Sequence, residues 1–216
     1  MVGIATEKAC KFIEGNTSIE CYLLRSNFVS EKKAASAQLC VGLGKEVSAE
    51  VVLSRQIVKK ILNSSPEKIS SAWHSWVLAS FSAGMVGINA QYANGLAAIF
   101  IACGQDPAHV ANSCIGITMF EVTNSGELYA AIRLPNLLLG TVGGGTALPT
   151  QRECLQMLGC YGKGKAKRFA EIVSATLLAG EIGICAGITS REFLQPHIKA
   201  RVFTREKTFG KDNLLQ

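Results

Sequence analysis

The stretch from Val77 to Asp106 constrains the fold most, because it contains no Lys, Arg or Glu and its single Asp stands at its end. Such a composition is typical of a helix that is buried on most sides. Small residues recur along the stretch and would let neighbouring backbones approach closely. The sequence therefore predicts one long central helix that carries Asn89 and Asn94 as a polar stripe into an enclosed region.

A membrane-spanning helix is the first alternative to test, because a helix of this length could cross a bilayer. Gly84, Gln91 and Asn94 stand in the middle of the stretch. Unpaired amides are costly in lipid, whereas a protein interior can pair them. No asymmetry of Lys and Arg flanks the stretch either. We therefore expect a core helix and no contact with a membrane.

The composition is that of a globular chain, with 48% hydrophobic and 18% charged residues over 216 positions. This length suffices for one good core. The net charge of +6 is moderate, and the basic residues are scattered except between Lys163 and Arg168. Aromatic residues are not interleaved with this basic cluster, so we expect no nucleic-acid binding.

The cysteines and the N-terminus indicate an intracellular protein. The eight cysteines form no CxxC pair, and His74, His109 and His197 do not stand at metal-ligand spacing with them. We expect buried reduced thiols and no structural zinc. The first residues lack the apolar core of a signal peptide, which favours a cytoplasmic location.

Periodicity and turn residues predict a mixed α+β chain. Helices are expected over residues 6–13, 54–62, from Pro66 toward Trp73, 149–158 and 167–188, with 191–199 continuing toward His197. Strands are expected over residues 19–24, 46–53, 114–121 and 128–134, the last two joined by a turn at 124–126. Residues 25–33 are expected to form a polar loop, and residues 201–216 a charged, mobile tail.

A glycine run from Gly140 to Thr146 is the most conspicuous loop motif. It lacks the Gly-Lys-Ser/Thr ending of a phosphate-binding loop and does not match GxGxxG. We therefore expect a tight turn where backbones pack closely, beside a site or a subunit contact.

Three ionisable groups could form a catalytic site: Lys32 or Lys33, Asp106 and His197. A buried Asp beside a Lys would hold a positive charge ready for an oxyanion, and a nearby His would exchange protons near neutral pH. The alternative is a surface lysine, a helix-end aspartate and a histidine satisfied in the core. Sequence spacing leaves both possibilities open.

The segments NAQYANGLAAIFIACGQD (89–106), LPNLLLGTVGGGTALPTQRECLQMLG (134–159) and ATLLAGEI (175–182) resemble the 3-hydroxy-3-methylglutaryl-coenzyme A (HMG-CoA) reductase family, in particular its eukaryotic type and the bacterial relatives of that type. Weaker matches extend the resemblance from about Met1 to His197. It implies an enzyme that reduces a thioester to mevalonate with two NADPH, in dimers whose active sites lie at the subunit interface.

By motif, the resemblance assigns catalytic roles to Lys32, Asp106 and His197, with His197 protonating the departing coenzyme A thiolate. Glu31 and Lys33 would face the substrate acid. Arg25, Asn27 and Asn94 would belong to the same substrate pocket.

Two further substrate-binding positions depart from the family pattern. His74 stands where relatives usually carry a lysine, and Gln91 stands where they carry a histidine. Arg25 also replaces a small serine, and Trp73 and Trp76 are new aromatics beside His74. These changes imply a reshaped acyl site.

The resemblance also implies a domain organisation. Residues 1–24 would be a remnant of the small, ferredoxin-like dinucleotide-binding domain, 25–33 the active-site loop, 34–200 the large domain with the long central helix, and 201–216 a tail. The catalytic glutamate and the dinucleotide motif of the family are expected upstream of residue 1. The chain alone is then expected to hold no cofactor, and NADPH only if the missing domain is supplied in trans.

The favoured functional hypothesis is a reductase-like scaffold used for non-redox acid-base chemistry, such as cyclisation, isomerisation or elimination, on a carbonyl, thioester or polyene-like substrate. One alternative is an NADPH-dependent HMG-CoA reductase completed by a separate N-terminal fragment. Another is a non-catalytic binding or assembly protein. In each case we expect a homodimer or higher homo-oligomer.

Overall fold

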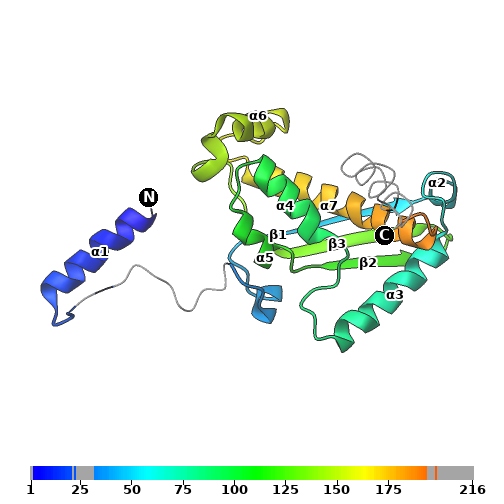
Figure 1. Ribbon diagram of the computed structural model, residues 1–216, viewed down its shortest axis with the longest axis horizontal. Helices are drawn as coiled ribbons and strands as arrows, with labels where there is room; N and C mark the ends of the chain where they lie inside the picture. Colours follow the sequence, from blue (N-terminus) through cyan, green and yellow to red (C-terminus); the bar gives the residue numbers. More distant parts are fainter. Residues whose placement is uncertain (1, 21, 23–31, 194–197, 199–216) are drawn as a thin grey trace, which may run out of the picture. The chain divides into compact units, whose positions relative to one another are not determined.

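The computed structural model describes residues 2–20, 22, 32–193 and 198 (Figure 1). The chain forms two compact units, residues 1–30 and residues 31–216. The first unit contains helix α1 (Val2–Asn16), which confirms the predicted first helix. The strand predicted over 19–24 is wrong where it can be compared, because Ile19, Glu20 and Tyr22 are not in a strand; the other residues of that range lie outside the described part.

A three-stranded antiparallel sheet lies at the centre of the second unit. Its strands are β1 (Lys45–Leu53), β2 (Ile117–Val122) and β3 (Leu128–Leu137), in the order β1-β3-β2. These three strands confirm the sequence-based predictions within a few residues. β3 is buried along most of its length because it is paired on both edges, whereas β1 alternates between half-buried and exposed positions. The mixed α+β class is therefore correct.

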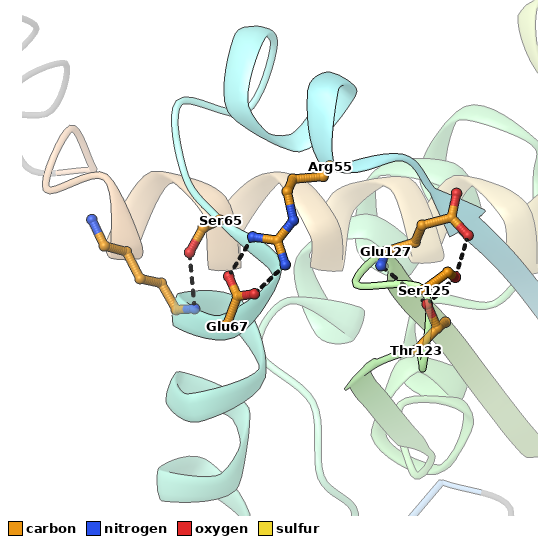
Figure 2. Close-up of polar contacts among 7 residues, drawn as sticks. Arg55, Ser65, Glu67, Thr123, Ser125 and Glu127 are labelled. Carbon is orange, nitrogen blue, oxygen red and sulfur yellow. Dashed lines mark hydrogen bonds and ion pairs between the residues drawn. The ribbon is translucent and has the colours of Figure 1, made fainter.

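Two serine residues cap the first two helices of the second unit. Ser54 caps α2 (Arg55–Lys60), and Ser65 caps α3 (Pro66–Ser82) by accepting a hydrogen bond from the Lys68 N–H. Figure 2 shows Arg55 forming a two-pronged pair with Glu67 of the first α3 turn. The same view shows the β2–β3 turn, where hydroxyl and carboxylate groups of Thr123, Ser125 and Glu127 bond to one another.

The single long central helix predicted from Val77 to Asp106 is wrong. Helix α3 ends at Ser82, and α4 (Tyr92–Ala102) begins only after a loop. Gly84 and Gly87 have φ angles of 66° and 99°, which interrupt a right-handed helix. In the loop, Ile88 forms a parallel bridge with Ile117 of β2.

Two amide side chains of this stretch, Asn89 and Gln91, lie between the end of α3 and the start of α4. The Asn89 side chain donates hydrogen bonds to the carbonyl oxygens of Cys114 and Gly116, so it fastens the loop beside β2. Gln91 precedes the first residue of α4. The predicted polar stripe is therefore wrong, because Asn89 belongs to a loop and Asn94 is exposed on α4.

The long core helix is instead α7 (Ala166–Thr189), which confirms the helix predicted over 167–188. It packs against β1, β3, α3 and α4, and Figure 1 shows it running along the sheet. Among the described helices, α7 alone is long and apolar enough to cross a membrane by length and composition. Ten of its residues are buried in this chain, so the core accounts for its apolar character.

The remaining described helical segments are short. They are α5 (Val110–Ser113), α6 (Pro149–Met157) and three short 3-10 turns, η1 (Ser36–Leu39), η2 (Pro107–His109) and η3 (Gly144–Ala147). The described cysteines are free thiols; Cys103, Cys160 and Cys185 are buried, whereas Cys40 is exposed. Burial raises the pKa of Cys103 to about 11 and that of Cys185 to about 12.

Candidate functional site

An ion pair joins two of the sequence-predicted catalytic residues. The Lys32 ammonium lies 2.8 Å from Oδ2 of Asp106, although 74 positions separate them in the chain (106 minus 32). The two side chains are 49% and 41% exposed. The predicted burial of Asp106 is thus wrong, because both side chains of the pair are exposed.

Asp106 is held in place from both sides of its carboxylate. It does not end a helix but precedes the η2 turn, where Oδ1 accepts a hydrogen bond of 2.9 Å from the Ala108 N–H. The Lys32 ammonium, followed by this N–H, keeps the pKa of the Asp106 carboxyl below its ordinary value. Asp106 is therefore a fixed negative charge at neutral pH that holds Lys32 in one position.

A cleft of about 550 Å³ opens beside Asp106. The glycine run forms part of its wall through Gly140, Gly143, Gly144 and Gly145. The wall approaches so closely that a Cβ on Gly104 would overlap the backbone of Gly145, which confirms the close packing predicted for this loop. Such a glycine wall lets a ligand approach the backbone directly.

Gln105 connects this wall to the end of α4. Its Oε1 accepts a hydrogen bond of 2.7 Å from the Gly140 N–H, and its Nε2 donates one of 2.7 Å to the Cys103 carbonyl. The Ser113 hydroxyl accepts a hydrogen bond from the Leu138 N–H. The Gln105 side chain thus holds Gly140 of the glycine run next to the segment that carries Asp106.

Two residues near the pair were not predicted from the sequence. Gln105 and His109 both line the cleft with Asp106, and the charge of His109 also favours the ionised form of Asp106. A signal was present in the order Gln105-Asp106-Pro107-Ala108-His109, because a Pro directly after an Asp predicts a tight turn that brings the next few side chains to one side.

Three of the predicted substrate-binding residues, His74, Gln91 and Asn94, are not among the described residues that line this cleft. His74 lies on α3, where its Nδ1 is 2.8 Å from the Ser70 carbonyl oxygen. Gln91 packs against α7 and donates a hydrogen bond to the Leu177 carbonyl. Asn94 is exposed on α4, and Lys33 is exposed beside Lys32. Arg25, Asn27, Glu31 and His197 lie outside the described residues.

Glu181 is a buried carboxylate that the sequence analysis did not single out. It accepts hydrogen bonds from the N–H groups of Ala90 and Gln91, just before α4, and from the Thr118 hydroxyl on β2. Burial raises the pKa of Glu181, and the three donors oppose this shift. Glu181 therefore connects α7, α4 and the sheet, and it fixes the start of the helix that leads to Asp106.

A site for a dinucleotide cofactor needs cations or free N–H donors, because these groups bind its phosphates. No Lys or Arg is among the residues that line the described cleft, and its one carboxylate would repel phosphate. Among the described residues that line the cleft, the backbone N–H groups of the glycine run are therefore the donors left for a phosphate.

A family model described as hydroxymethylglutaryl-coenzyme A reductase matches residues 1–202. The 3-hydroxy-3-methylglutaryl-coenzyme A reductase of Methanocaldococcus jannaschii is 44% identical over 204 residues, which cover 91% of this chain and 50% of that protein. The protein of the same name from Pyrococcus horikoshii is 42% identical over 204 residues, covering 91% and 49%. The reductase 1 of Hevea brasiliensis is 33% identical over 212 residues, covering 92% and 36%. The chain thus spans about half the length of the first two relatives.

Proposed function

Because the chain belongs to the hydroxymethylglutaryl-coenzyme A reductase family, we propose that Lys32 and Asp106 form the carbonyl-polarising part of a reductase-type active site. The observation that carries this proposal is the 2.8 Å ion pair beside the glycine-walled cleft. The substrate class is a thioester, with the acyl carbonyl placed at the Lys32 ammonium.

The pair acts through electrostatics. When a thioester carbonyl is attacked, negative charge develops on its oxygen, and a preorganised ammonium stabilises that charge more than it stabilises the ground state. Asp106 keeps Lys32 oriented and charged. We further propose that His197 protonates the departing thiolate and that Arg25, Asn27, Glu31 and Lys33 contact the substrate acid.

These residues do not supply hydride, and NADPH provides it when bound. The described cleft walls offer the phosphates of this cofactor no Lys or Arg side chain. We propose that nicotinamide binding belongs to the half of the reductase relatives that this chain does not match.

The test uses HMG-CoA and NADPH with the purified chain, alone and together with the unmatched half of the M. jannaschii relative. NADPH consumption is expected only in the mixture. Lys32→Met and Asp106→Asn should each lower kcat by about 100-fold or more, since they remove a charge used in the transition state. Lys68→Ala, an exposed cation on α3, is the control and should leave kcat unchanged. Full activity of Lys32→Met in the mixture would refute the proposal.

A second candidate function is non-redox acid-base chemistry, such as cyclisation, isomerisation or elimination. It is favoured by the absence of Lys and Arg from the described cleft walls and by the positions of His74 and Gln91, which bond to backbone carbonyls away from the cleft. This candidate predicts that the chain alone converts a carbonyl, thioester or polyene-like substrate without NADPH, and that Lys32→Met abolishes the conversion. If neither assay detects turnover, a binding or assembly role is the remaining proposal.

We also propose a cytoplasmic homodimer or higher homo-oligomer, in line with the resemblance to a dimeric family. Light scattering on the purified chain tests the oligomeric state. A monomer at all concentrations would contradict it.

A further inference from the structure

A second hollow, separate from the cleft beside Asp106, lies between α3, the loop before α4, and α7. Its volume is about 340 Å³, and its walls include Trp76 of α3, Asn89 of the loop and Ile184 of α7. The hollow and the cleft have no lining residue in common among those that the structure describes. Ligand pockets have volumes of about 300–1,000 Å³, so this hollow has the size for a small organic molecule.

Glu181 is the one charged residue among the described residues that line the hollow. Its side chain is almost fully buried, and no described Lys or Arg forms an ion pair with it. Burial raises the pKa of this carboxyl, because the anion is removed from water without a counter-charge. A cation bound in the hollow would supply that counter-charge.

The hydrogen bonds of Glu181 restrict the kind of cation. Its two oxygens already accept four contacts, two from the Ala90 N–H and one each from the Gln91 N–H and the Thr118 hydroxyl. An ionised carboxylate has about four acceptor positions, so these contacts use them up. A primary ammonium would have to displace one of the donors. A quaternary ammonium has no N–H group and interacts through its charge alone.

Two indole rings line the same hollow. Trp73 and Trp76 are three positions apart on α3, which brings them to one side of the helix, and both are half-buried. The Trp73 Nε1–H donates a hydrogen bond of 2.6 Å to the Thr118 carbonyl oxygen, so this ring is held beside β2. The face of an indole ring attracts cations, and rings grouped around a pocket are a known means of binding quaternary ammonium groups.

We propose that the hollow lined by Trp73, Trp76 and Glu181 binds a small quaternary ammonium compound. The carboxylate provides the opposite charge, and the indole rings contact the methyl groups. Met85 and Ile188 add soft apolar surface to the same walls. This binding site goes beyond the proposed reaction, because it uses neither Lys32 nor Asp106.

The test compares two probes of the same shape by isothermal titration calorimetry on the purified full chain. One probe is choline, and the other is 3,3-dimethylbutan-1-ol, in which a carbon replaces the charged nitrogen. Choline should bind at least about tenfold more tightly, because only choline gains the attraction of the carboxylate and the rings. Choline should also change the tryptophan emission, since both tryptophans of the chain line the hollow.

Variants test the two components of the site. Glu181→Gln should weaken choline binding at least about tenfold and leave the binding of the alcohol unchanged, since it removes only the charge. Trp76→Leu should weaken choline binding at least about fivefold through the loss of one ring. The matched control is Glu121→Gln, which changes an exposed carboxylate of β2 that does not line the hollow. Lys32→Met should bind choline like the wild type while losing the proposed turnover.

Three results would overturn the inference. The wild-type chain shows neither heat nor a change of emission with choline, or it binds the alcohol as tightly as choline, which would make the hollow a site for neutral apolar molecules. The third is unchanged choline affinity in Glu181→Gln. Thermal unfolding checks that the variants are folded, and the comparison of the two probes on the wild-type chain decides the question even if a variant is not.

Discussion

Two carboxylates of this chain show how burial decides the behaviour of a residue. Asp106 is partly exposed and paired with Lys32, so the folded state lowers its pKa. A lowered pKa means that the pair stabilises the fold above the ordinary Asp pKa of about 3.9 and that this contribution is lost as the pH falls through the lower folded value. Glu181 is buried, and its pKa is raised instead.

For Glu181 the change of stability with pH has the opposite sign. A carboxyl whose folded pKa is raised binds its proton more tightly in the folded state, so stability increases as the pH falls through the raised pKa. Glu181→Gln should still accept hydrogen bonds from the N–H groups of Ala90 and Gln91. It should remove this pH dependence of the unfolding free energy. We expect the variant to be at least as stable as the wild type at neutral pH, with the difference shrinking toward acid pH, as measured by urea unfolding at several pH values.

The contrasting variant is Glu181→Leu, which leaves the N–H groups of Ala90 and Gln91 and the Thr118 hydroxyl without their acceptor. It should lose at least about 2 kcal/mol of unfolding free energy. Equal stability of Glu181→Leu and wild type would show that the network does not support the fold.

At the scale of elements, glycines decide where helices stop and where segments touch. Gly84 and Gly87 end the continuous helix that the apolar composition predicted. Gly104, after α4, has a φ of 66° and lies against the backbone of Gly145 in the glycine run. The cleft beside Asp106 thus depends on a residue without a side chain.

Gly104→Ala should therefore destabilise the protein by about 1–3 kcal/mol, because it introduces both an unfavourable φ and an overlap with Gly145. Gly183→Ala is the control, since Gly183 lies inside α7 with open space around it. In a helix this change should be neutral or stabilise by about 0.5–1 kcal/mol. Denaturant unfolding measures both, and an undisturbed Gly104→Ala would contradict the close approach.

At the scale of the molecule, α7 rather than the Val77–Asp106 stretch is the central helix. Leu177 of α7 is fully buried, whereas Leu78 of α3 is 70% exposed. The sheet, α4 and α7 form one core, and α3 contributes to that core mainly through its first turns, where Pro66, Ile69 and Ser70 are buried.

Substituting the two leucines tests this arrangement in the purified chain. Leu177→Ala should cost about 2–5 kcal/mol, because it removes transfer energy and leaves a cavity. Leu78→Ala should stay within about 0.5 kcal/mol of the wild type. Comparable losses for the two variants, measured by urea unfolding, would contradict the assignment of α7 as the core helix.

The sequence by itself determined the local elements and the family, because caps, turn residues and strand patterns are local signals. Ser54, Ser65 and Pro66 marked helix starts correctly, and the motifs around Asp106 and the glycine run identified the reductase resemblance. Composition, however, cannot separate one long buried helix from two helices with a loop, because both are poor in charge. Only the tertiary structure decided that Ile88 forms a bridge with Ile117 of β2 and that the Asn89 side chain bonds to the Cys114 carbonyl.

The same limit applies to the site. Motif spacing proposed Lys32 with Asp106, but their contact joins segments far apart in the chain, and it depends on how the sheet, α4 and the glycine run pack. Packing also separated His74, Gln91 and Asn94 from that cleft and brought Gln105 and His109 into it. Side chains that are distant in sequence are brought together by the burial of apolar surface, which is a property of the whole core rather than of any local motif.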